Sequence, residues 1–93
     1  MAARREAGFQ LGRVQAGLEP VDWKPFDVVG PGTREIRIRD VNGIYRVLYV
    51  AKFEDAIYVL HCFQKKVQAT SIQDKAITEA RYRAIEQARK TIR

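Results

Sequence analysis

Six ionisable side chains could do chemistry together, because all of them lie in or next to short segments that otherwise look like β-strands. If those strands are neighbours, the cations converge on one surface and can bind a phosphodiester backbone. The same charges could stabilise the negative charge that develops when the 2′-hydroxyl of RNA attacks its own phosphate. The six residues are Arg37, Arg39, Arg46, His61, Lys65 and Lys66.

Each of these side chains also has a purely structural explanation. The first two arginines could simply keep one face of a strand in water. Arg46 interrupts an apolar run, where a charge costs free energy unless it is paired or hydrated, and Glu35 is an available acidic neighbour. His61 could be a hydrogen-bonded histidine of the core, and the two lysines could mark the end of a strand.

Metal and cofactor chemistry are not expected from this sequence. The single histidine and the single cysteine are adjacent, as His61 and Cys62, so they would point to opposite faces of a strand and could not share a metal. The nearest approach to a phosphate-binding loop, residues 29–32, contains a proline and precedes a strand rather than a helix. Cys62 is predicted to be a small buried hydrophobe.

Periodicity predicts an α+β fold built as a helix, a three-stranded antiparallel meander and a second helix. Apolar residues three or four positions apart predict the helices at 3–18 and 73–90, the second with Ser71 and Asp74 as its capping box. A proline-rich connection follows the first helix, and its aromatic residues Trp23 and Phe26 are expected to cover the core. The predicted strands are 33–40, 44–53 and 56–64, joined by turns at Asn42-Gly43 and Glu54-Asp55.

Composition predicts one small domain spanning residues 1–93, with a formal net charge of +6 that lies after residue 32. A segregated positive charge favours an anionic partner, with nucleic acid as the first candidate. No apolar stretch approaches the roughly 20 residues that cross a membrane, and nothing resembles a signal peptide. A cytoplasmic protein without membrane partners is the expectation.

The strand segments resemble the phage-derived, HigB-like branch of the RelE superfamily, over about residues 9–83. The resemblance rests on Trp-Lys-Pro-Phe at 23–26, the basic strand at 33–40, Tyr-Arg-Val-Leu-Tyr at 45–49 and Leu-His-Cys-Phe-Gln-Lys-Lys at 60–66. It implies a RelE-like fold and a toxin of a type II toxin-antitoxin system. Such a toxin is an endoribonuclease that cuts messenger RNA on the ribosome by 2′-hydroxyl attack, and a cognate antitoxin silences it.

Carried over residue by residue, the resemblance gives each candidate a role. Arg37 and Arg39 match strand positions that contact RNA, and Lys65, which stands beside Lys66, is counted with them as an RNA-binding residue. Arg46 matches the arginine that stabilises the scissile phosphate, and Lys66 matches a second basic catalytic position. His61 is typical of this branch and completes the catalytic candidates.

Two departures from the family pattern leave alternatives open. The tyrosine that transfers protons in RelE has no counterpart between residues 67 and 72, so Lys66, His61 or Tyr82 would have to substitute. The family's first strand is also missing, which leaves a sheet edge that another chain, including a second copy, could fill. The alternative function is therefore a binding module without catalysis, either a ParE-like gyrase inhibitor or an antitoxin partner only.

Overall fold

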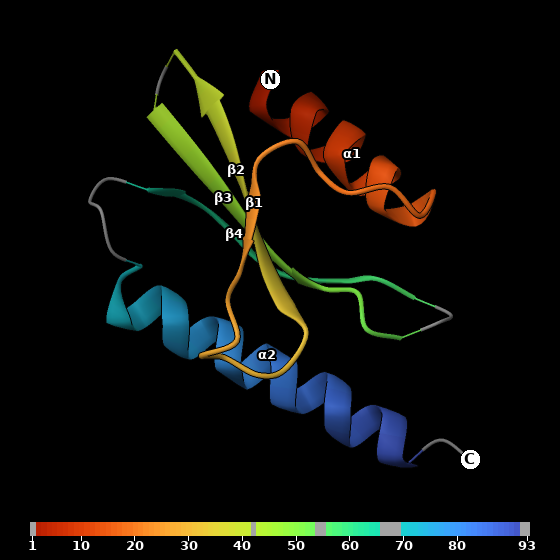
Figure 1. The fold of residues 1–93 in the computed structure, drawn as a ribbon. Coiled ribbons are helices and arrows are strands. Elements are labelled where there is room, and N and C mark those ends of the chain that lie inside the picture. The colour runs from red at the N-terminus through yellow and green to blue at the C-terminus, as the bar shows by residue number, and fades with distance from the viewer. Residues whose placement is uncertain (1, 42, 54–55, 66–69, 92–93) are drawn as a thin grey trace.

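The computed structural model describes residues 2–41, 43–53, 56–65 and 70–91 (Figure 1). These residues form two helices and one antiparallel sheet whose four strands lie in sequence order. The expected α+β architecture and the meander are confirmed. The elements are α1 (Ala2–Gln15), β1 (Trp23–Pro25), β2 (Thr33–Asp40), β3 (Gly43–Val50), β4 (Tyr58–Lys65) and α2 (Ile72–Thr91).

The prediction of only three strands was wrong, because the short strand β1 lies in the segment expected to be a connection. Trp23 pairs with Ile36 and Pro25 with Arg34, so β1 extends the sheet at the outer edge of β2. A proline is tolerated there because an edge strand has a side that donates no hydrogen bonds to the sheet. Its three residues are too few to show the alternation that betrays a longer strand.

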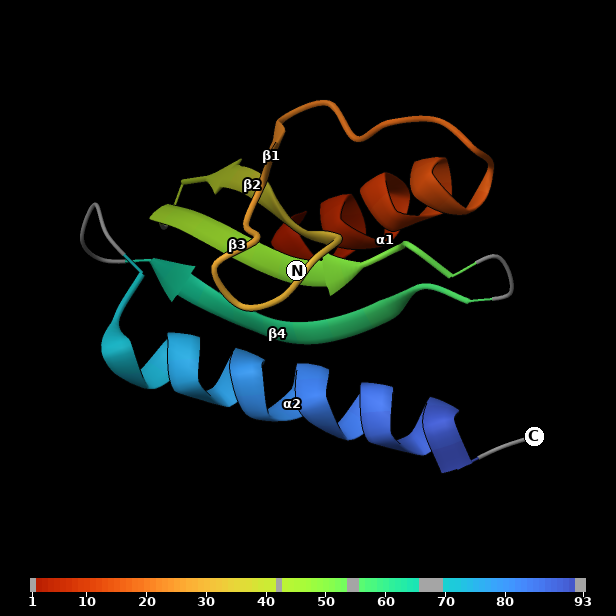
Figure 2. The same cartoon turned by 60° about the horizontal axis from the view of Figure 1, so that its bottom comes forward.

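The two helices lie on opposite faces of the sheet, as Figure 2 shows. Helix α1 packs against a core cluster that contains Ile36, Ile38, Val47 and Tyr49. Helix α2 covers the other face along β4, where Tyr82 joins a second, smaller cluster. The molecule is therefore a three-layer arrangement in which each helix shields only part of its face. None of the helices among the described residues is long and apolar enough to cross a membrane.

Local hydrogen bonds and backbone conformation determine where α1 ends and where α2 begins. The backbone N–H of Leu18 donates to the carbonyl of Arg13, and Gly17 adopts a φ of 82°, which stops α1 earlier than the predicted residue 18. At the start of α2, the backbone N–H of Asp74 donates to the Ser71 hydroxyl at 3.0 Å. The predicted capping pair is confirmed, and the helix begins at Ile72.

Strand β4 contains an irregularity that decides which way its side chains point. His61 pairs with Leu48 and Val59 pairs with Tyr49, so Leu60 has no partner on β3 and forms a β-bulge. As a result Leu60 and His61 both lie on the α2 side, Leu60 in the core and His61 against α2. The bulge therefore changes the simple alternation expected of this strand.

Two packing predictions have opposite outcomes. Trp23 is half-buried against the α1-side cluster, in agreement with the expectation that it covers the core. Cys62 was expected to be buried but is exposed. It lies on the α1 side of β4, where α1 does not cover it because α1 packs on β2 and β3. The predicted turns at Asn42 and at Glu54-Asp55 lie outside the described residues.

Candidate functional site

The face of the sheet on the α2 side carries four of the six predicted site residues. In the register of β2 and β3, Arg37 lies opposite Arg46, and Arg39 lies one rung further towards the tip of the hairpin. His61 projects from β4 on the same face. It lies opposite Leu48, which is two residues beyond Arg46 on β3. With about 4.8 Å between neighbouring strands and about 3.4 Å per residue along them, the backbones of Arg37 and His61 lie about 12 Å apart. The register therefore brings these four residues to one face of the sheet.

Arg46 is buried and paired, which is the structural explanation that the sequence offered for it. Its guanidinium binds a carboxylate oxygen of Glu35, and the two side chains are 6% and 0% exposed. The ammonium of Lys24 lies 3.7 Å from the same oxygen and is half exposed. Arg46 and Glu35 are diagonal neighbours on adjacent strands, within reach of two long side chains. The charge of Arg46 is thus largely neutralised inside the protein.

Each of the two facing arginines has its own carboxylate. Like charges opposite each other on adjacent strands repel, so Arg37 and Arg46 would destabilise the sheet if both were unpaired. Arg37 instead donates to Asp22 at 2.9 Å, and Asp22 lies just before β1. With Lys24 and the exposed Arg39 included, four cations face two carboxylates, so this surface keeps a positive excess.

His61 and Asp74 form a hydrogen-bonded pair at the junction of β4 and α2. Nε2 of His61 lies 2.8 Å from a carboxylate oxygen of Asp74. Nδ1 faces the guanidinium of Arg81 at 3.5 Å, and the same guanidinium donates to the Leu60 carbonyl at 2.8 Å. These partners assign the ring proton to Nε2 and leave Nδ1 as the acceptor. The imidazole also stacks on Phe63, with ring centroids 5.0 Å apart.

The Asp74 carboxylate stays ionised to unusually low pH. A hydrogen bond from the Ser71 hydroxyl and then the contact with His61 hold the pKa of Asp74 below its ordinary value of 3.8. An ionised carboxylate beside Nε2 fixes the orientation and the tautomer of the imidazole. This is the arrangement that a histidine needs in order to accept and return a proton.

Unpartnered buried atoms gather on the same face. Among the described residues, four of the five buried side-chain atoms that lack a hydrogen-bond partner belong to this face, whereas buried polar atoms normally have a partner. Such a cluster next to a cationic surface is typical of a site that takes up water or ligand atoms. The four atoms are Oγ1 of Thr33, Oε2 of Glu35, Nε of Arg37 and Nε of Arg46.

The remaining predicted residues are Lys65, Lys66 and the proton-transfer candidate Tyr82. Lys65 ends β4 opposite Ile44, so its backbone reaches the same region. Lys66 lies outside the described residues. Tyr82, one of the proposed proton-transfer groups, is buried elsewhere: its hydroxyl donates to the Pro31 carbonyl at 2.6 Å and accepts from Lys52 at 2.8 Å. Tyr82 therefore joins α2 to the loop after β1.

Sequence reasoning missed three members of the site. Asp74 was recognised as a helix cap, but its second role as the partner of His61 depends on where α2 begins relative to β4. No pattern in the sequence pointed to Asp22 or Arg81 as site residues, because each meets its partner only through tertiary packing. In the described part of the chain, no three histidine, cysteine, aspartate or glutamate side chains gather as metal ligands would.

The sequence matches the model of a family described as phage-derived protein Gp49-like (DUF891), and the match spans residues 1–83. No curated protein gives a significant match to the chain, and no solved structure does so either.

Proposed function

The chain belongs to the phage-derived Gp49-like family, which is associated with toxins of toxin-antitoxin pairs, and from this premise we propose that it is such a toxin and acts as an endoribonuclease. Its substrate would be messenger RNA on the ribosome, in the cytoplasm. The observation that carries the proposal is the His61–Asp74 pair, which lies on the same face of the sheet as Arg37 and Arg39. A proton acceptor and phosphate-binding cations are the two things that RNA self-cleavage requires.

The proposed reaction uses the substrate's own nucleophile. Nδ1 of His61 accepts the proton of the 2′-hydroxyl, whose oxygen then bonds to the adjacent phosphorus. The bond from phosphorus to the 5′-oxygen breaks, that oxygen takes up a proton, and a 2′,3′-cyclic phosphate remains. Asp74 holds the imidazole and stabilises its positive charge after proton transfer. Arg81 must yield its long contact at Nδ1 when RNA binds.

The cations of this face differ in how directly they can contact RNA. Arg39 is exposed and Arg37 is half-buried, so both can meet phosphate oxygens directly. Lys65 ends β4, across β3 from Arg39. Phe63, half-buried beside His61, can stack against a base. Arg46 can stabilise the scissile phosphate only if its guanidinium turns from Glu35 towards the substrate. Lys66 stays a candidate for protonating the leaving oxygen.

Cleavage in a cell-free translation reaction tests the proposal. Discrete new 5′ ends mapped by primer extension should appear with the unaltered chain. His61→Gln should reduce their yield by about 10²–10⁴-fold, the usual contribution of general acid–base catalysis. Arg83→Gln, which removes an exposed cation of α2, should change the yield less than about twofold. Equal cleavage by the His61→Gln variant would contradict the assigned role.

The burial of Arg46 favours one alternative, a toxin-family binding module without catalysis. A phosphate-binding arginine that is 6% exposed and paired with a carboxylate is poorly placed for chemistry. Such a protein would bind a cognate antitoxin, or would inhibit DNA gyrase in the manner of ParE-like proteins. If the folded, unaltered chain yields no cuts, this function replaces the first. DNA cleavage provoked in the presence of gyrase would then separate the gyrase inhibitor from the antitoxin partner.

Either function requires an antitoxin as the partner, and we propose that the antitoxin binds at the edge strand β4. This strand forms one edge of the sheet, with β3 on its inner side. A segment of another chain could add there as a further strand, or a second copy of this chain could do so. Co-purification with the product of a neighbouring gene, lost on proline substitution of an exposed residue such as Val59, would test this contact.

A further inference from the structure

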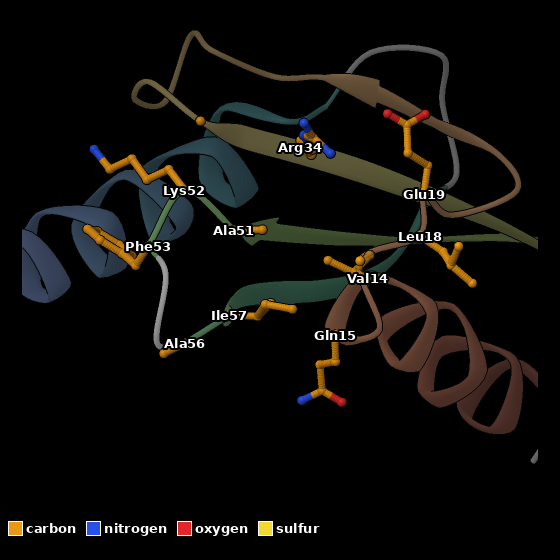
Figure 3. Close-up of a pocket in the computed structure, with 12 residues that line it drawn as sticks. Val14, Gln15, Leu18, Glu19, Arg34, Ala51, Lys52, Phe53, Ala56 and Ile57 are labelled. Carbon is orange, nitrogen blue, oxygen red and sulfur yellow. The ribbon is translucent and has the colours of Figure 1, made fainter.

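A second candidate site lies on the opposite face of the sheet, between the end of α1 and the strand ends (Figure 3). The pocket has a volume of about 520 Å³, within the range of ligand-binding pockets. Its apolar lining includes Val14, Leu18 and Ile57, which come from three different parts of the chain. The position on the α1 side separates it from the surface that carries His61 and Arg37.

Arg34 supplies an available positive charge in this pocket. Its side chain points to the α1 side because Arg34 lies opposite Tyr49 in the register of β2 and β3. Its guanidinium lies 4.3 Å from the centroid of the Trp23 ring. In the described ranges no carboxylate comes within 4.0 Å of it, although Arg37 and Arg46 on the other face each have one. A half-buried arginine with an apolar neighbour on one side is well placed to bind an anion.

The second cation of the pocket is already occupied. Lys52 binds the Tyr82 hydroxyl at 2.8 Å and lies 3.6 Å from a carboxylate oxygen of Glu86. The Tyr82 hydroxyl is the main cause that raises the pKa of Lys52. Figure 3 shows its ammonium directed away from Arg34. Since the Glu19 carboxylate also lines the pocket, Arg34 can bind one carboxylate but not a multiply charged phosphate.

A buried hydroxyl beside the pocket lacks a partner. Tyr49 is 0% exposed, and its hydroxyl forms no hydrogen bond to any described residue. Burial raises the pKa of Tyr49, while the approach of the Arg34 side chain and its charge lower it. Tyr49 is not itself among the residues that line the pocket, so its hydroxyl belongs to the surroundings of Arg34 and is not counted among the groups that contact a ligand.

We propose that this pocket binds an acidic side chain next to an apolar one on a segment of a partner protein. The carboxylate accepts hydrogen bonds from Arg34, and the apolar neighbour packs against Val14, Leu18 and Ile57. The net charge of +6 suits an acidic segment. The inference does not rest on RNA cleavage, because it uses the other face of the sheet.

A displayed library of random heptapeptides, selected on the full chain, is the first experiment. Enriched peptides should contain aspartate or glutamate beside leucine, isoleucine, valine or phenylalanine. A synthetic copy of an enriched peptide should lose at least tenfold in affinity when its acidic residue becomes the amide, as measured by fluorescence anisotropy. It should lose as much on Arg34→Met. The matched control is Arg39→Met, an arginine of the same strand on the other face, which should change the affinity less than twofold.

A second variant keeps the test decisive if Arg34→Met fails to fold. Leu18 is 54% exposed, so Leu18→Glu should leave the fold intact while placing a carboxylate at the pocket within reach of Arg34. This variant should also lose at least tenfold in affinity. Enriched peptides without acidic residues, or binding that survives both variants, would overturn the proposal. Displacement of the peptide by sodium hexanoate at equal affinity would instead assign the pocket to small organic acids and would also overturn it.

Discussion

Replacing Arg46 with methionine should destabilise the fold strongly, because it removes the closest cation from a fully buried carboxylate. Glu35 is 0% exposed and binds Arg46 through one oxygen, while its second oxygen has no partner among the described residues. Methionine fills similar space without a charge, so the loss of volume is small. The variant therefore isolates the cost of leaving Glu35 ionised inside the protein.

The magnitude follows from the burial of the pair. Breaking a buried ion pair on one side costs about 3–5 kcal/mol. Lys24 lies 3.7 Å from the same oxygen of Glu35 and remains in the variant, so the lower end, about 3 kcal/mol, is expected. For a domain of this length, that loss corresponds to a fall in Tm of roughly 12–24 °C. Replacing both partners, as Glu35→Met with Arg46→Met, should restore stability to within about 1 kcal/mol.

Thermal unfolding followed by circular dichroism measures both variants against the unaltered chain. The reasoning is refuted if Arg46→Met lowers the free energy of unfolding by less than about 1 kcal/mol, or if the double variant is no more stable than the single one. The result also governs how Arg46 is tested for catalysis. Cleavage lost in an Arg46 variant informs on chemistry only at a temperature where that variant is shown to be folded.

Two further predictions concern other parts of the fold. The pKa of Asp74 is lowered on folding, chiefly by the Ser71 hydroxyl, so its contribution to stability is present above about pH 4 and is lost as the pH falls through the folded value. Asp74→Asn should flatten the dependence of Tm on pH between 2 and 5, Ser71→Ala should do so in part, and unchanged slopes would contradict the assignment. Gly30→Ala should cost about 1–3 kcal/mol, because its new Cβ would lie 2.4 Å from the ring of Tyr82. Urea unfolding would show this, and recovery of stability in Gly30→Ala with Tyr82→Leu would identify the clash as the cause.

The sequence predicts the elements well where the residues themselves carry the signal. Alternating isoleucines and arginines gave β2 its correct bounds, and Ser71 with Asp74 placed the start of α2 to within one residue. Strand β1 escaped notice because its pairing with β2, rather than any pattern of its own, makes it a strand. Cys62 was misjudged because apolar neighbours along the chain do not reveal that α1 stops short of β4.

The candidate site was predictable as a set of residues but not as a set of contacts. Arg46 in an apolar run signals that a partner must exist, and the register of β2 and β3 makes Glu35 that partner. Nothing in the local sequence indicates that Asp22 would bind Arg37, because these residues meet only when β1 pairs with β2. The same holds for His61 and Asp74, which packing of α2 on β4 brings together.

The bulge in β4 determines which side chains of this strand face the site. Tyr58 and Leu60 face α2, and plain alternation from them would continue with Cys62 and Gln64. The extra residue resets the count so that an imidazole and an aromatic ring take those places, and the thiol faces the opposite side. If β4 kept its length but lost the bulge, its register beyond Val59 would slip by one residue, and a cysteine surface would replace the histidine surface without any substitution. Closing the bulge would therefore have the effect of several simultaneous mutations, because every side chain beyond it would change face.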